Sequence, residues 1–529
     1  MSRCRPATGR ASPRISLMPR AISTSRTHPI PMRRRRFIAY SCHSLPGGSG
    51  HICTTRGVPH PRLVTSSPAN LRRVGLALAP STAQTFRNMK SHFKKVFCVA
   101  FLIAFWLANI SAAGFLIRDG DRVVFLGDSI TEQRLYTTYI EAYALTRHPT
   151  WKLTFRNVGW GGDTSWLRQR SHPDEKQLFA ADEASQQKMV EDSVGRGLGR
   201  DVLPLKPTFV TIKFGMNDHS YQPFREDIFR AYVRSQTEIA KVLGTNGARV
   251  AFLTPQPIED KRPDPDKDVR NQSLRQFSDG LKDVAAKSSA AYVDQFDPFM
   301  KILLRERASN PPSFIGGGDA VHPGPVGQTL MAWAVLKGLG ASSLVSRAEI
   351  DAAGKKAPAV EGCRVSGLQV SGGTVSFDRL DEALAMPVDE RAEAALKLAP
   401  ILDDLNLYEL QISGLTGGDY EVTVDGESSG KVSAEELAKG WNLANAPGPI
   451  TKQAREVLKL VFDKNNAFFR RWREVQLFSL PGWAHGPEVE TKRAAELARI
   501  DAQVGELEVQ IDKARKPKSH HFEIKPAAR

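Results

Sequence analysis

Between residue 121 and about residue 340, the chain alternates short apolar runs with stretches of helical periodicity. The apolar runs predict strands at 122–126, 152–157, 208–214, 249–253 and 291–294. Helices are expected between them, with the clearest patterns at 135–147, 225–243 and 271–288. This alternation favours a parallel sheet covered on both faces. Because such sheets bind ligands beyond the carboxyl ends of their strands, the pattern predicts an α/β fold with a site at that edge.

The positive charge of the chain is confined to its first part. The 529 residues carry a net charge of +16, from 73 Lys and Arg against 57 Asp and Glu. Fifteen arginines and three lysines precede Gly114, and the first acidic residue is Asp119. Without these 18 cations, 55 remain against 57 acids, so the rest of the chain carries about −2. The basicity therefore belongs to a leader, and no nucleic-acid partner is expected.

Residues 89–113 have the pattern of a secretory signal peptide. Lysines follow Met89, the apolar run 96–110 comes next, and Ser111-Ala112-Ala113 supplies small residues before a cut at Gly114. An uncleaved anchor is the alternative, but the run is shorter than the roughly 20 residues that span a bilayer. We therefore expect an exported protein, periplasmic or extracellular, without stable membrane insertion.

Residues 1–88 are rich in Arg, Ser and Pro and contain no acid, so we expect them to be disordered. A signal peptide should be N-terminal, so a translation start at Met89 is the simplest hypothesis, with a transit peptide as the alternative. Beyond the leader the only cysteine is Cys363, so no internal disulfide is expected there. No Cys/His spacing indicates a zinc site, and neither a metal nor an organic cofactor is expected.

The texture of the sequence changes after about residue 345. An α/β domain is expected over 114–345, including a long charged insertion at 163–200, and a small β-rich module over 360–445, interrupted by a helix at 387–398. Helices are expected over 449–515. The end of the chain, from Lys516, is expected to be loose, with His520 and His521 on the surface.

Four short segments carry the chemistry: Gly127-Asp128-Ser129, Gly161-Gly162-Asp163-Thr164, Gly215-Met216-Asn217-Asp218 and Asp319-Ala320-Val321-His322. A serine nucleophile needs a base, and His322 can take this role with Asp319 orienting its ring. An oxyanion needs fixed donors, which the backbone N–H of Gly162 and the amide of Asn217 can offer. Each segment alone is a weak signal, but their combination at the ends of predicted strands is not. Trp160 and Asp128 are candidate substrate-binding residues, although core packing explains Trp160 equally well.

With these blocks in order, residues 120–340 resemble the SGNH hydrolase family, also called GDSL esterases/lipases. The matching blocks are Gly-Asp-Ser-Ile-Thr at 127–131, Asn-x-Gly-x-x-Gly-Asp at 157–163, Gly-x-Asn-Asp at 215–218 and Asp-x-x-His-Pro at 319–323. The resemblance implies a three-layer α/β/α sandwich with a five-stranded parallel sheet, as in flavodoxin-like folds. It also implies a Ser129-His322-Asp319 mechanism with Ser129, Gly162 and Asn217 forming the oxyanion hole.

The expected function is hydrolysis of acyl esters, acetyl in particular, on a small-molecule or polysaccharide substrate. Export and an appended β module favour carbohydrate. A lipid or lysophospholipid esterase is one alternative, and a non-catalytic carbohydrate-binding protein that keeps the fold is another. The oligomeric state is left open.

Overall fold

The structure, a computed structural model, describes residues 114–311 and 313–527. The predicted basic extension (1–88) and signal peptide (89–113) lie outside the described residues. Among the helices of the described part, none is long and apolar enough to cross a membrane.

A five-stranded parallel sheet forms the centre of the first domain, with the strand order β2-β1-β3-β4-β5. The strands are β1 (Arg122–Gly127), β2 (Thr154–Asn157), β3 (Phe209–Lys213), β4 (Arg249–Leu253) and β5 (Ala291–Val293). All lie within two residues of the predicted ranges. The side chains of the three central strands, β1, β3 and β4, are buried on both faces, which is why these strands read as near-continuous apolar runs.

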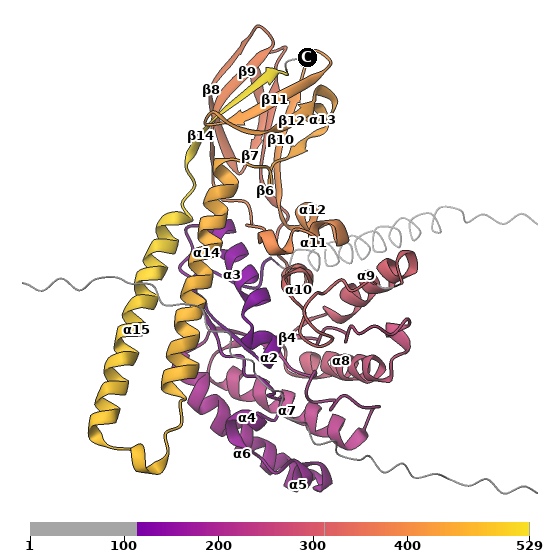
Figure 1. Cartoon of the computed structure of the whole chain (residues 1–529), viewed down its shortest axis with the longest axis vertical. Coiled ribbons are helices and arrows are strands. Elements are labelled where there is room, and N and C mark those ends of the chain that lie inside the picture. Colours follow the sequence, from indigo (N-terminus) through magenta and orange to yellow (C-terminus); the bar gives the residue numbers. More distant parts are fainter. Residues whose placement is uncertain (1–113, 312, 528–529) are drawn as a thin grey trace, which may run out of the picture. The chain divides into compact units, whose positions relative to one another are not determined.

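Helices cover both faces of this sheet (Figure 1). One face packs against α3 (Leu135–Arg147), α9 (Phe296–Ser309) and α10 (Pro325–Gly338). The other packs against α6 (Glu183–Asp201), α7 (Glu226–Thr245) and α8 (Val269–Lys287). Short elements complete the domain: α2 (Ser129–Glu132), α4 (Arg168–Ser171), α5 (Glu175–Ala180), η1 (Leu203–Leu205) and η2 (Pro265–Lys267). Alternate residues of one strand serve the two layers: Val123 and Phe125 face α3, and Val124 and Leu126 face α7.

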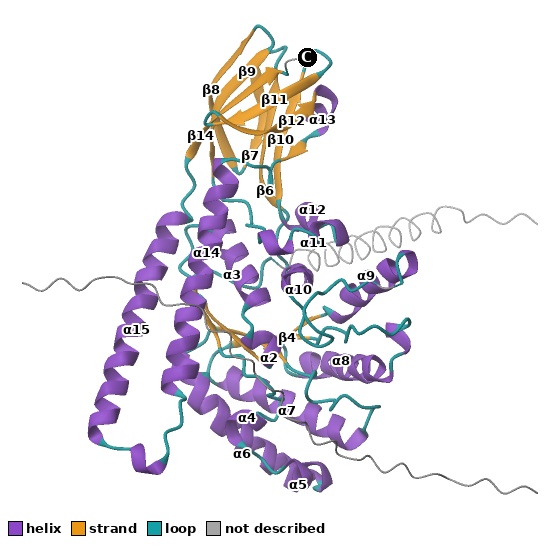
Figure 2. Ribbon diagram, in the orientation of Figure 1, coloured by secondary structure: helices purple, strands orange, loops and turns teal. Residues whose placement is uncertain are grey.

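Two further sheets form the β-rich module, which Figure 2 shows as a separate group of strands. One has the order β13-β10-β6-β7 and the other β12-β11-β14-β9-β8. The strands are β6 (Leu344–Asp351), β7 (Lys356–Glu361), β8 (Cys363–Ser371), β9 (Thr374–Asp381), β10 (Leu407–Ser413), β11 (Asp419–Val424), β12 (Glu427–Ser433), β13 (Trp441–Asn442) and β14 (Ser519–Pro526). Residues of both sheets, such as Leu410 and Phe377, share one apolar cluster. The predicted fold class, a three-layer sandwich with a β module and C-terminal helices, is confirmed.

Two predictions about this region are wrong. The end of the chain is not loose, because β14 lies between β11 and β9 and pairs with both. Phe522 and Ile524 point into the core, and His520 is buried with its Nδ1 2.7 Å from Asp425 Oδ2. The helix expected at 387–398 is broken into η3 (Glu390–Ala392) and α11 (Ala395–Leu398), followed by α12 (Ile401–Leu405); α13 spans Ala434–Lys439. η3 begins after Asp389, whose carboxylate accepts the N–H of Arg391 at 3.0 Å and a hydrogen bond from Tyr139 of α3.

The C-terminal helices pack against the first domain as well as against each other. They are α14 (Pro449–Phe469), its π-helical continuation η4 (Arg470–Gln476), η5 (Gly482–Ala484) and α15 (Pro487–Ala514). Val457 and Val461 of α14 enter the apolar cluster on one side of the parallel sheet. Phe468 and Trp472 enter the cluster on the other side. One edge of the sheet is therefore covered by a segment far away in sequence.

Candidate active site

Ser129 is the first residue of α2, immediately after β1. Asp128 caps this helix, because its Oδ1 accepts a hydrogen bond from the N–H of Ile130 at 3.0 Å. A backbone N–H in the first helical turn has no acceptor within the helix, so the N–H of Ser129 is available to an anion. The local sequence thus places a hydroxyl and a donor at the carboxyl end of a central strand.

His322 connects Ser129 with Asp319. Ser129 Oγ lies 2.8 Å from His322 Nε2, and His322 Nδ1 lies 3.0 Å from Asp319 Oδ2. We assign the proton of the ring to Nδ1, because the carboxylate can only accept and the serine hydroxyl then donates to Nε2. The structure therefore brings together the three residues that the sequence predicted as nucleophile, base and orienting acid.

The loop that carries Asp319 and His322 is a tight turn built on glycine. Gly318 has φ of +72°, and a Cβ there would lie 2.2 Å from the carbonyl oxygen of His322. Asp319 Oδ1 accepts the backbone N–H groups of Val321 and His322, each at 2.8 Å. Burial works to raise the pKa of Asp319, but these hydrogen bonds and His322 outweigh it and hold the pKa below its usual value. The carboxylate is thus ionised and oriented toward the imidazole.

The predicted oxyanion donors, Gly162 and Asn217, lie on loops after β2 and β3. Gly162 has φ of +75°, a conformation that favours glycine. Asn217 Nδ2 donates to the carbonyl of Asp163 at 2.9 Å, and its Oδ1 accepts from the hydroxyl of Tyr221 at 3.2 Å. The amide is therefore held from both ends, with one of its two N–H groups left for a ligand.

Asp218 fastens these two loops together. Its carboxylate, which is completely buried, accepts the N–H of Ser165 at 2.8 Å and the N–H of Gly215 at 2.9 Å. Burial raises the pKa of Asp218 to about 6, although both hydrogen bonds work in the opposite direction. Asp218 fixes the spacing of the two loops that carry the predicted donors.

A pocket of about 520 Å³ opens above Ser129. Its lining residues are Ser129, Glu132, Gln133, Gly318, Asp319, His322 and Phe469. The two residues predicted to bind substrate are not among them. Asp128 is completely buried as the helix cap, and the ring of Trp160 is covered by the guanidinium of Arg473, 4.1 Å from the ring centre.

Sequence reasoning missed four residues in or beside this pocket: Glu132, Gln133, Phe469 and Arg473. Glu132 lies three positions after Ser129 on α2, and its Oε2 accepts the N–H of Gly161 at 2.8 Å. Helical spacing from the nucleophile could have indicated it. Phe469 and Arg473 come from α14 and η4, and nothing in the local sequence relates that segment to the serine.

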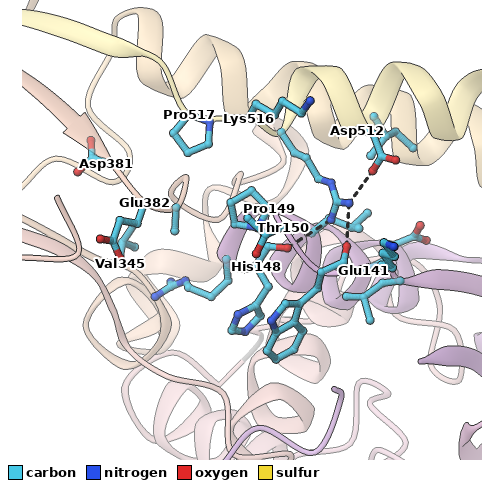
Figure 3. A pocket seen from close by; sticks show the side chains of 18 of the residues that line it. Glu141, His148, Pro149, Thr150, Val345, Asp381, Glu382, Asp512, Lys516 and Pro517 are labelled. Carbon is cyan, nitrogen blue, oxygen red and sulfur yellow. Dashed lines mark hydrogen bonds and ion pairs between the residues drawn. The ribbon is translucent and has the colours of Figure 1, made fainter. Parts of the chain in front are cut away.

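A larger cavity, of about 1180 Å³, lies elsewhere in the molecule (Figure 3). It is lined by His148 after α3, Glu382 after β9, and Asp512 and Lys516 near the end of α15. None of the residues predicted to act in catalysis or substrate binding lines it. The arrangement around Ser129 is therefore the candidate active site.

Comparison with protein families agrees with this site. Residues 125–330 match the model of the GDSL-like Lipase/Acylhydrolase family, a stretch that contains all four sequence blocks. This match confirms the resemblance seen in the sequence. The domain is accordingly a hydrolase that acts on ester bonds.

Three solved structures are similar to the chain, and the first of them has the same fold. BT4096, a gut microbial diltiazem-metabolizing enzyme, is 24% identical with a TM-score of 0.64, over 78% of this chain and 98% of that chain. Axe2, an acetylxylan esterase from Geobacillus stearothermophilus, is 21% identical with a TM-score of 0.31, over 42% and 96%. LAE5, an alpha/beta hydrolase enzyme from the metagenome of Lake Arreo, Spain, is 22% identical with a TM-score of 0.33, over 43% and 98%. The first of these extends the shared fold beyond the residues of the family match. No curated protein matches the chain.

Proposed function

We propose that Ser129, His322 and Asp319 act as a catalytic triad that hydrolyses short acyl esters, acetyl esters of carbohydrates in particular. The observation that carries the proposal is the unbroken chain of contacts from Ser129 Oγ to His322 Nε2 at 2.8 Å and from His322 Nδ1 to Asp319 Oδ2 at 3.0 Å. These are hydrogen-bond distances, as a nucleophile and its base require.

In the first half of the reaction, Ser129 Oγ attacks the ester carbonyl carbon while its proton passes to His322 Nε2. Asp319 stabilises the imidazolium that forms. The negative charge on the former carbonyl oxygen is received by the N–H groups of Ser129 and Gly162 and by the amide of Asn217. The bond to the alcohol oxygen then breaks, the alcohol takes the proton from His322, and the acyl group remains on Ser129.

In the second half, water takes the place of the alcohol. His322 accepts a proton from the water, whose oxygen attacks the acyl carbon, and the same donors hold the second oxyanion. When the bond to Ser129 breaks, His322 returns the proton to Oγ. The products are one carboxylic acid and one alcohol, and the side chains return to their starting state.

The character of the pocket favours a short acyl group and a polar alcohol. Six of its seven lining residues are polar, charged or glycine, and Phe469 is the single apolar one. A long acyl chain gains its affinity from burial against apolar walls, which this pocket does not offer. A sugar hydroxyl ester presents a small acyl group on a polar ring, which suits the lining.

We also propose that the enzyme works outside the cytoplasm, in the periplasm or beyond the cell. The support is the signal-peptide pattern of residues 89–113. N-terminal sequencing of the native protein tests this point. A mature chain that begins at Gly114 agrees with export, and a native chain that still carries residues 1–113 contradicts it.

The substrate proposal is tested by a panel of esters with one enzyme preparation. Hydrolysis of p-nitrophenyl acetate, butyrate and octanoate gives the acyl preference. Acetate release from acetylated xylo-oligosaccharide, against fatty-acid release from lysophosphatidylcholine, gives the alcohol preference. Ser129→Ala is the matched control for each substrate.

We expect kcat/KM to fall from acetate to octanoate, acetate release from the oligosaccharide, and no turnover by Ser129→Ala. A preference for octanoate and lysophosphatidylcholine would show that the substrate is a lipid ester and not a carbohydrate ester. Folded wild-type protein that binds the oligosaccharide without hydrolysing any ester would make the domain a binding protein.

A further inference from the structure

The end of α14 and the start of η4 lie at the rim of the proposed active site, although they follow the family-matched residues by more than one hundred positions. Figure 1 shows α14 running beside α3, and their contact includes the hydrogen bond from Asn465 Nδ2 to Thr138 Oγ1 at 2.9 Å. Phe469, the last residue of α14, lines the pocket above Ser129. A substrate bound there therefore lies next to a segment outside the family domain.

Arg473 of η4 reaches the oxyanion loop through Glu132. Arg473 Nε lies 3.3 Å from Glu132 Oε1, and Glu132 Oε2 accepts the N–H of Gly161 at 2.8 Å. The carboxylate of Glu132 thus bridges the guanidinium of Arg473 and the backbone N–H of Gly161. The Arg473 and Glu132 side chains are 30% and 24% exposed, so solvent only partly screens their attraction.

Arg473 also covers the residue before Gly161. Its guanidinium carbon lies 4.1 Å from the ring centre of Trp160, and the backbone N–H of Trp160 donates to the carbonyl of Gly127 at 3.0 Å. Trp160 is packed edge to face against Trp472, the neighbour of Arg473 on η4. The segment from Trp160 to Gly162 is therefore held between the end of β1 and η4.

Holding the segment from Trp160 to Gly162 in place matters because the next peptide, Gly161–Gly162, carries the N–H proposed to receive the oxyanion. Gly162, with its positive φ, depends on its neighbours to keep its N–H directed at the ligand, since glycine itself is free to rotate. The hydrogen bond from the Gly161 N–H to Glu132 fixes the Trp160–Gly161 peptide, which directly precedes the peptide that carries the Gly162 N–H. Without Arg473, one oxygen of Glu132 loses its partner and the carboxylate can turn away from Gly161.

We propose that Arg473 is a positioning residue of the esterase: through Glu132 it holds the Gly161–Gly162 loop in the conformation that receives the oxyanion. The inference rests on the proposed function of Ser129 and Gly162. If so, the C-terminal helical segment is part of the active site, and residues 125–330 alone do not contain every residue that the active site needs.

The test compares Arg473→Met, Arg473→Lys and Arg471→Met with the wild-type full chain, using p-nitrophenyl acetate. Arg471 is the matched control, since it lies two residues away on η4 and pairs instead with Asp501 of α15 at 2.7 Å. We expect Arg473→Met to lose about tenfold to a hundredfold in kcat with KM little changed, as for a misplaced catalytic group. Arg473→Lys restores part of this loss, and Arg471→Met keeps the wild-type kcat.

A double-mutant cycle with Glu132→Gln shows whether the two residues act as a unit. If Arg473 works through Glu132, the double variant loses no more kcat than Glu132→Gln alone, because the single losses are not additive. Unfolding midpoints in urea for all variants show whether the fold is intact. Equal stability with unequal kcat separates positioning from a general structural role.

Two results would overturn the inference. One is a kcat for Arg473→Met equal to that of Arg471→Met, and the other is strictly additive losses in the cycle. Both leave the proposed function untouched if wild type turns over and Ser129→Ala does not. Conversely, a wild type that never hydrolyses the ester and whose Ser129 never reacts with a fluorophosphonate rejects the proposed function itself.

Discussion

Lys464 of α14 and Glu141 of α3 form an ion pair whose side chains are only 1% and 3% exposed. Lys464 Nζ lies 2.5 Å from Glu141 Oε1, and Asn465 Nδ2 donates to Glu141 Oε2 at 2.9 Å. Burial lowers the pKa of Lys464 and raises the pKa of Glu141, and each partner's charge opposes the shift of the other. The pair joins the C-terminal helix to the hydrolase domain in the interior.

Removing one partner of this pair leaves the other charge buried without compensation. We expect Lys464→Met to lower the free energy of unfolding by about 3–5 kcal/mol, as measured by urea denaturation. In the double variant with Glu141→Leu neither charge of the pair remains, so we expect this variant to recover a good part of the lost free energy of unfolding. A double variant as unstable as the single one would mean that packing, and not the charge, governs this contact.

Phe522 of β14 stacks on Phe377 of β9, with ring centres 5.2 Å apart and planes at 4°. Both rings are completely buried in the β module. Phe522→Ala should therefore destabilise the module by about 3–5 kcal/mol in calorimetry. His521→Ala is the control on the same strand, since its ring is exposed and its contact with Asp378 is worth about 1 kcal/mol or less. A loss for Phe522→Ala as small as that expected for His521→Ala would show that the packing of β14 does not stabilise the module.

Asn217→Ala removes one proposed oxyanion donor. We expect kcat for p-nitrophenyl acetate to fall by about 10²–10³, the usual effect of losing a single donor. Tyr221→Phe should lower kcat much less, because it removes only the hydroxyl that orients the side-chain amide of Asn217. If Asn217→Ala keeps the wild-type rate, Asn217 has no part in binding the oxyanion.

We expect His219 to make the stability of the domain depend on pH. It is 2% exposed, and burial lowers its pKa to about 4, outweighing the carbonyl of Gly215 that accepts from Nδ1 at 3.1 Å. Because the unfolded chain binds the proton more readily, this contribution to stability is present above pH 6.5 and is lost as the pH falls toward 4. Its size is about 3 kcal/mol.

His219→Asn keeps a donor for Gly215 but does not titrate in this range. Urea denaturation of both proteins between pH 7 and pH 4 should show a smaller acid-induced loss of stability for the variant. Parallel pH profiles would show that His219 does not titrate between the folded and unfolded states in the way its burial implies.

The proposed triad was predictable from the sequence because each of its blocks is local. A glycine turn after an apolar strand places Ser129, and three positions separate Asp319 from His322, so one turn holds both. The carboxyl ends of parallel strands then meet at one edge, which unites blocks that lie far apart in sequence. The same logic located the five strands and the principal helices within two residues.

What the sequence could not reveal depends on partners far away along the chain. Arg473 and Phe469 have no local signature of a site, and only the packing of α14 brings them to Ser129. The pattern of β14 is short and mostly polar, and its place in the middle of a sheet depends on pairing with β9 and β11. His520 reads as a surface residue until Asp425 is found beside it.

We propose above that Ser129 is a nucleophile activated by His322. Intact-protein mass spectrometry after treatment with a fluorophosphonate tests it most directly, with the labelled peptide then identified by fragmentation. We expect one label on Ser129 in the wild type, none in Ser129→Ala, and labelling slowed by at least about a hundredfold in His322→Ala. Folded wild-type protein that takes up no label, or Ser129→Ala that is labelled as fast as wild type, would contradict it.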